Sequence, residues 1–175
     1  MASKLRVDSI LPVDGAPTGG GGGIIQVVHS STATLMQQTT IDTDYDTNLS
    51  ATITPKFNTS KILIMVSQMC SIRSTVAGTF AMQLSLVRTP SGGSSVIIID
   101  GDNGATSMGN FTGRANTPTS YNSMTAMQPL HILDEPATTT ALTYKTTALL
   151  TTSNSTMKLH EDGVKSYMTL MEVSA

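Results

Sequence analysis

Apolar and polar residues alternate along much of the chain, and the alternation is cleanest in residues 79–88. Threonine, alanine, glutamine and serine fill one set of alternate positions. The other set is apolar: Phe80, Met82, Leu84 and Leu86. Because successive side chains of a strand point to opposite faces, this period predicts a β-strand with one buried face.

Residues 61–69 differ, because every position from Ile62 to Val66 is apolar. A strand that is apolar on both faces is typical of the centre of a sheet. Six further segments also have strand-like patterns: 24–29, 48–54, 96–99, 123–133, 142–151 and 167–173. Pro129 falls inside one of them, and a proline cannot donate a ladder hydrogen bond, so we expect that strand to lie at a sheet edge or to begin late.

Turn residues separate these segments, as in Thr54-Pro55 and Glu161-Asp162-Gly163. No stretch has the capped apolar stripe of a helix. About eight strands in residues 24–175 therefore predict an all-β domain, an antiparallel β-sandwich of the jelly-roll kind.

The first 23 residues have a different character. Five glycines at 19–23 cannot pack a core and predict a tether. A short arm precedes them, too small to fold alone, with apolar residues that water would leave unburied: Leu5, Val7, Ile10 and Leu11. We interpret residues 1–23 as a docking arm and tether for a partner surface. An unstructured tail is the alternative.

Composition excludes several classes of protein. The chain has 10 Lys and Arg and 12 Asp and Glu, so charged residues are 13% of the total, about half the usual 25% or so. No basic patch for nucleic acid is expected, and no apolar run is long enough to cross a bilayer, so we expect no membrane insertion. Ser and Thr account for 48 of 175 residues. With so few charges, the surface of the protein is either covered by hydroxyl groups or buried against other chains.

No catalytic, cofactor or metal site is predicted. His29, His131 and His160 are isolated, and Cys70 stands in a buried-strand context. The acidic runs near 42–46 and 100–104 lack the closing ligand of a calcium loop. We therefore expect no enzyme and no cofactor, although carboxylate spacing alone leaves a glycoside-cleaving site open.

Two stretches lack Asp, Glu, Lys and Arg altogether, residues 74–87 and 115–133. A charge-poor surface that contains methionine and tyrosine is typical of subunit interfaces, so we expect subunits to meet there. Ordinary core strands are the alternative explanation for both stretches.

Four segments resemble small structural proteins of tailed bacteriophages, in particular tail-fibre-like and virion-decorating proteins of phages of marine bacteria. They are residues 3–10 with Gly15-Ala16-Pro17, residues 60–66, residues 133–145 and residues 168–173. The run Asp134-Glu135-Pro136-Ala137-Thr138-Thr139 is the most specific piece. Unlike long fibres, the chain has no repeated shaft.

The resemblance implies a jelly-roll-like homotrimer in the virion, made in the host cytoplasm and anchored to other virion proteins of tail or capsid by its arm. The chain would be a tail-fibre-type appendage that attaches to a host receptor, or alternatively a capsid decoration protein that cements the head. A polysaccharide-cleaving tail enzyme is the minor alternative. Candidate contact residues of the distal loops are Asp100, Asp102, Asn103, Asn154 and Asp162.

Overall fold

The computed structural model describes residues 23–100, 110–115 and 122–174. The described chain is almost entirely β, with one short 3-10 helix, η1 (Glu161–Gly163). The strands are β1 (Ile24–Thr32), β2 (Met36–Gln38), β3 (Asp44–Ile53), β4 (Lys61–Ser74), β5 (Gly78–Pro90), β6 (Val96–Ile99), β7 (Asn110–Ala115), β8 (Asn122–Asp134), β9 (Leu142–Leu150), β10 (Ser155–Leu159) and β11 (Ser166–Val173).

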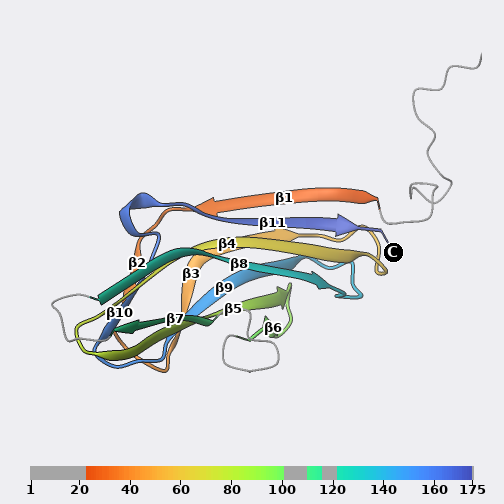
Figure 1. Ribbon diagram of the computed structural model, residues 1–175. Coiled ribbons are helices and arrows are strands. Elements are labelled where there is room, and N and C mark those ends of the chain that lie inside the picture. The colour runs from red at the N-terminus through yellow and green to blue at the C-terminus, as the bar shows by residue number, and fades with distance from the viewer. Residues whose placement is uncertain (1–22, 101–109, 116–121, 175) are drawn as a thin grey trace, which may run out of the picture.

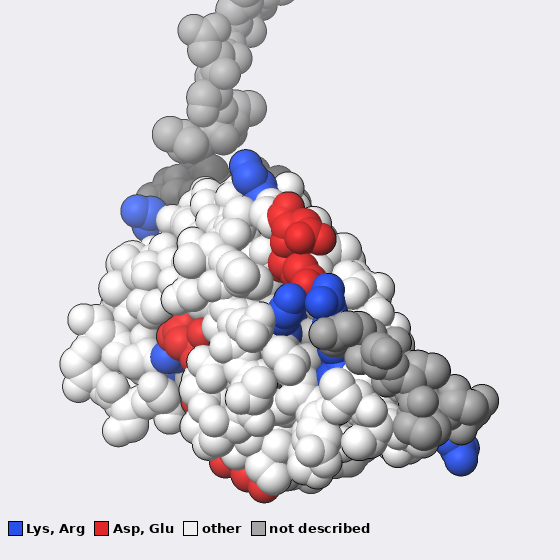
Figure 2. All heavy atoms as spheres, turned by 90° about the vertical axis from the view of Figure 1, so that its left-hand side faces the viewer, with Lys and Arg blue, Asp and Glu red and all other residues white. Residues whose placement is uncertain are grey.

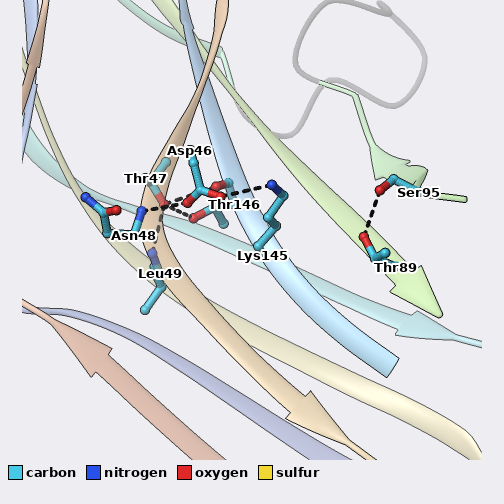
Figure 3. A network of polar contacts seen from close by, with 8 residues as sticks. All are labelled: Asp46, Thr47, Asn48, Leu49, Thr89, Ser95, Lys145 and Thr146. Carbon is cyan, nitrogen blue, oxygen red and sulfur yellow. Dashed lines mark hydrogen bonds and ion pairs between the residues drawn. The ribbon is translucent and has the colours of Figure 1, made fainter. Parts of the chain in front are cut away.

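All eight predicted strand segments are present. The prediction missed β2, β7 and β10, which are short and polar and have little alternation of their own. It also began β3 four residues late, because Asn48 has a positive φ of 62° and the register with β9 shifts between Asp46 and Ser50. Asp46 Oδ1 accepts a hydrogen bond from the Asn48 backbone N–H, which holds this bulge (Figure 3).

The strands form two antiparallel sheets that lie one above the other (Figure 1). In the first sheet, β4 pairs with β8 along one edge, and with β11 and then β10 along the other. Outside these, β1 pairs with β11 and β2 with β10. In the second sheet the order is β3, β9, β5, and then β7 and β6, which pair in succession with different parts of β5.

The strand order is that of a jelly roll. Counting β1 with β2, β6 with β7, and β10 with β11 as single interrupted strands gives eight in chain order. The first sheet then reads 1-8-3-6 and the second 2-7-4-5. The predicted fold class is therefore confirmed. The strand that contains Pro129 is β8, which pairs only with β4 among the described strands, as expected of an edge.

The core is the layer between the sheets, and β5 shows how the sequence fills it. Phe80, Met82, Leu84 and Leu86 are all buried there, as the alternation predicts. The opposite faces of β3 and β9 carry mostly threonine, serine and charged side chains that reach water. Thr52 and Thr143, for example, hydrogen-bond across these two strands at 2.8 Å between their hydroxyl oxygens.

Two polar bridges cross this apolar layer. In the first, Arg88 of β5 donates both to Oδ1 and to Oδ2 of Asp134 in β8, each at 2.7 Å. The Tyr144 hydroxyl of β9 donates to the same carboxylate at 2.7 Å. Burial raises the pKa of Tyr144, and the adjacent Asp134 carboxylate raises it further, so the phenol keeps its proton and remains a donor.

The second bridge is centred on Gln68 of β4, whose side chain is fully buried. Its Oε1 accepts from the Thr146 hydroxyl of the opposite sheet at 3.0 Å, and its Nε2 lies 3.1 Å from Ser166 Oγ and 2.9 Å from His160 Nε2. Thr146 in turn contacts the Thr47 hydroxyl, which also accepts from the Leu49 backbone N–H (Figure 3).

Replacing Asp134 by leucine should lower the free energy of unfolding by about 3 kcal/mol, because the largely buried Arg88 side chain loses its counter-ion. Urea denaturation measures this change. The matched control is Glu135→Ala, which breaks an exposed ion pair with Lys61 and should cost about 0.5 kcal/mol or less. Equal losses in the two variants would show that the bridge does not hold the sheets together.

Stability should also depend on His160. Its Nδ1 lies 2.8 Å from the Thr34 carbonyl oxygen and must donate, so Nε2 is unprotonated and accepts from the Gln68 amide. Burial lowers the pKa of His160, so the folded state binds fewer protons than the unfolded chain, whose histidines titrate near about 6.5. The stability contribution is therefore complete above about pH 7 and is lost as the pH falls below about 6.5.

Thermal melts at pH 7.5 and pH 5.0 test this dependence with His160→Asn. Asparagine tolerates the positive φ of 57° at this position and can still donate to the Thr34 carbonyl. The wild type should lose more stability than the variant between the two pH values. A variant that loses as much as the wild type would show that His160 does not sense pH.

Candidate assembly interface

The predicted arm residues lie outside the described residues: Leu5, Val7, Ile10 and Leu11. Gly23, the first described residue, is fixed beside the carboxyl end of β11. Its N–H donates to Ser174 Oγ at 3.0 Å, and its carbonyl accepts from the Ser174 N–H at 3.0 Å. Gly23 and the start of the edge strand β1 therefore lie at one end of the first sheet (Figure 1).

The candidate loop residues are not gathered in one place. Asp102 and Asn103 lie outside the described residues, and Asp100 directly follows β6 in the second sheet. Asn154 precedes β10 in the first sheet, whereas Asp162 lies in η1, beyond the opposite end of β10. Both side chains are exposed on backbone of positive φ, 56° at each residue. Their role in host contact remains a prediction.

A more extensive surface feature is the outer face of the first sheet, the face turned away from the core. The pairing register places four residues in one row across β1, β11, β4 and β8: Val27, Met171, Leu63 and Leu133. All four are apolar, and none is fully buried. A continuous apolar row across four strands is unusual on a face that meets water.

The next two rows of this outer face contain few groups that need water. One row holds His29, Thr169, Met65 and His131, and the other holds Ser31, Tyr167, Ser67 and Pro129. His29 stacks on Tyr167 with ring centroids 5.9 Å apart, and His29 Nδ1 lies 3.0 Å from Thr169 Oγ1. These contacts fix the rings on the surface.

Several large apolar side chains of this face are exposed, by these fractions: Val27 55%, Leu133 48%, Met127 41% and Tyr167 41%. Ile24, which is 60% exposed, adjoins them in the row of Lys61. From here on, the outer face means the outward positions of β1, β11, β4 and β8. It is bounded by the row of Lys61 at one end and by the row of Lys158 at the other, and these two rows are not part of it. No Lys, Arg, Asp or Glu occupies an outward strand position within those bounds.

Paired charges border the outer face at both ends. At one end, Lys61 Nζ lies 2.6 Å from Glu135 Oε1. At the other, Arg73 and Lys158 both contact Glu161 Oε1. The hydrogen bond from Lys158 lowers the pKa of Glu161 against the opposing effect of burial, so this carboxyl is ionised at neutral pH. Figure 2 shows charged side chains in a few small groups, separated by broad uncharged surface.

The two charge-free stretches of the sequence have different structural explanations. Within residues 115–133, Ala115 ends β7 and residues 122–133 belong to β8, whose outward side chains are largely exposed. Most of residues 74–87, by contrast, forms the core strand β5, with Leu84 and Leu86 fully buried. Burial in the core accounts for the missing charge at the inward positions of β5, and an interface on its outward side remains a prediction.

The sequence pattern alone did not predict that β1, β4 and β11 contribute to this surface. One indication of it is that residues 62–66 are apolar at every position, so both faces of β4 carry apolar side chains. Ile62, Ile64 and Val66 are in the core as expected, but Leu63 and Met65 lie half-buried on the outer face. A strand that is apolar on both faces predicts the centre of a sheet, but it is equally compatible with an outer face that a second chain covers.

Other chemistry is sparse in the described part of the chain. Cys70 is fully buried, and burial raises its pKa, which keeps the thiol protonated and unreactive. No group of three or more His, Cys, Asp or Glu among the described residues is placed to hold a metal ion. Within the same ranges, no helix is long and apolar enough to cross a membrane.

No protein-family model and no curated protein matches the chain. Solved structures similar to it include VP2 of infectious bursal disease virus. A VP2 mutant in T=1 particles is 12% identical over 96% of this chain and 40% of its own, with a TM-score of 0.38. The chain of other T=1 particles derived from this virus is 10% identical over 99% of this chain and 42% of its own, with a TM-score of 0.40. The chain of the T13 particle is 11% identical over 86% of this chain and 38% of its own, with a TM-score of 0.37.

This chain thus spans about two fifths of the length of the VP2 chains that it matches. All three TM-scores are below 0.5.

Proposed function

We propose that the chain is a structural subunit of a virus particle, of the tailed-phage kind, which assembles as a homotrimer through the outer face. The observation that carries the proposal is the apolar row of Val27, Met171, Leu63 and Leu133, on a face without charged strand positions. Near the threefold axis of a trimer the same residues of three copies meet, so charged residues there would repel one another, and this face has no charged strand position.

The size of the effect can be bounded. Five exposed side chains, each about half exposed, would gain on the order of 1 kcal/mol apiece when covered, or about 5 kcal/mol per copy. Association itself costs at least about 4 kcal/mol. Contacts of this face alone therefore support a reversible oligomer, and the arm and the particle would add the remaining stability.

The fold supports the same function. Jelly rolls are common in viral capsid domains, and also in lectins and cupins, so the fold alone does not fix the function. The arm supplies the second attachment, with Leu5, Val7, Ile10 and Leu11 buried against another virion protein. Gly23, the residue that follows the arm, lies at the start of the edge strand β1.

Our first hypothesis is a tail-fibre-type appendage with host attachment, and the alternative is a capsid decoration protein that cements the head. Both hypotheses include a homotrimer that is anchored by the N-terminal arm. The number of copies per particle separates them, since about a dozen copies fit an appendage and hundreds fit a decorated shell.

In solution the chain should have a mass of about 55 kDa, three times the 18.4 kDa of one copy. Leu133→Glu should shift it to a monomer, because each interface would have to bury a carboxylate. Light scattering after size exclusion measures both masses, and circular dichroism confirms that the variant is folded.

The matched control is Ile97→Glu, a substitution on β6 of the other sheet at a similar exposure of 53%. It should leave the trimer intact. A wild type that is monomeric at every concentration, or a Leu133→Glu variant that keeps the wild-type mass, would contradict the proposal.

Deleting residues 2–23 should leave a folded trimer that no longer joins virions, because the arm would be the anchor. Incorporation is measured by blotting purified particles from cells in which the truncated chain replaces the full one. A chain of full length carrying Leu5→Asp and Val7→Asp provides a second variant, which tests the apolar contacts of the arm. Normal incorporation of both chains would refute the docking role.

A further inference from the structure

A polar hollow lies at the charged end of the first sheet, outside the outer face defined above. Its volume is about 210 Å³, and it opens to solvent. Six side chains line it: Gln37, Arg73, Thr75, Asn154, Thr156 and Lys158. All are polar or charged, so an apolar ligand would find no matching surface.

The pairing of three strands brings these side chains to one surface. Gln37 of β2 is paired with Lys158 of β10, and Thr156 of β10 is paired with Arg73 of β4. Thr75 and Asn154 close the end of the hollow, where the Thr75 N–H donates to the Asn154 carbonyl at 3.3 Å. Most of the lining is therefore on regular strands, which hold the groups at fixed spacing.

The hollow has a net positive charge. Arg73 and Lys158 contribute two charges, and Glu161, which both contact, removes one, which leaves one positive charge. Glu161 also orders the two long side chains, because each is held at a common oxygen atom. A guanidinium has five N–H donors, and the contact with Glu161 leaves several of them for a second anion.

The neutral lining groups have hydrogen-bonding capacity to spare. The side chains of Gln37, Thr75, Asn154 and Thr156 have no hydrogen-bond partner among the described residues. Together they present two amides and two hydroxyl groups, each able both to donate and to accept. Sugar hydroxyls need this combination, whereas a simple inorganic anion needs donors only.

We propose that this hollow binds one carboxylated sugar residue, such as a hexuronic acid. Arg73 would bind the carboxylate, assisted by Lys158, and the amides and hydroxyl groups would bind the ring hydroxyls. The volume equals that of about seven water molecules in the liquid, which suits a single sugar ring. The site does not depend on the oligomeric state, so it stands separately from the proposed function.

Galacturonic acid is the probe, titrated into the full-length protein and followed by NMR chemical shifts. Methyl galactoside tests the need for the carboxylate, and acetate tests the need for the ring. Galacturonic acid should bind at least fivefold more tightly than either of them, and added salt should weaken it. No saturable binding of galacturonic acid, or equal binding of acetate, would overturn the proposal.

Two variants locate the site. Thr156→Val keeps the shape of the side chain but removes its hydroxyl, and should weaken galacturonic acid about fivefold. Thr147→Val, on the outward side of β9 in the other sheet, is the matched control and should change nothing. Lys158→Gln removes the net charge while Arg73 keeps its contact with Glu161, so it should remove the preference for galacturonic acid over methyl galactoside. Unchanged binding in both lining variants would contradict the assignment.

Discussion

The whole arrangement depends on the pairing of β4 along both of its edges. This 14-residue strand, Lys61–Ser74, pairs with β8 on one side over its length and with β11 and β10 in succession on the other. The pairing fixes which side chains of four strands share a row. It also sends Gln68 inward to the Thr146 hydroxyl of the second sheet, which sets how the two layers lie against each other.

The same register has opposite consequences on the two faces of the sheet. Inward, Ile62, Ile64 and Val66 join the core between the layers. Outward, Leu63 and Met65 stand in rows that no other part of the described chain covers completely. The low charge of the sequence thus has two physical sources, since core strands such as β5 exclude charge and the outer face lacks it where a neighbouring subunit would lie.

The sequence predicted the fold well, because period-two alternation and turn residues act over short distances. All eight predicted strands exist, and Pro129 correctly marked an edge. Strands as short as β2 and β10 have too few side chains to show a pattern, and they exist because neighbouring strands pair with them. The candidate interface was only partly predictable, since Val27 and Met171 become neighbours through a pairing between opposite ends of the chain.

In the assembled protein, neighbouring subunits should cover the outer face. Hydroxyl-radical oxidation of the wild type and of a monomeric variant, followed by mass spectrometry, measures the exposure of individual side chains. Met127 and Tyr167 should be several-fold less oxidised in the wild type, while Ile97 on the other sheet should be oxidised equally in both. Equal oxidation of Met127 and Tyr167 in the two forms would contradict the account.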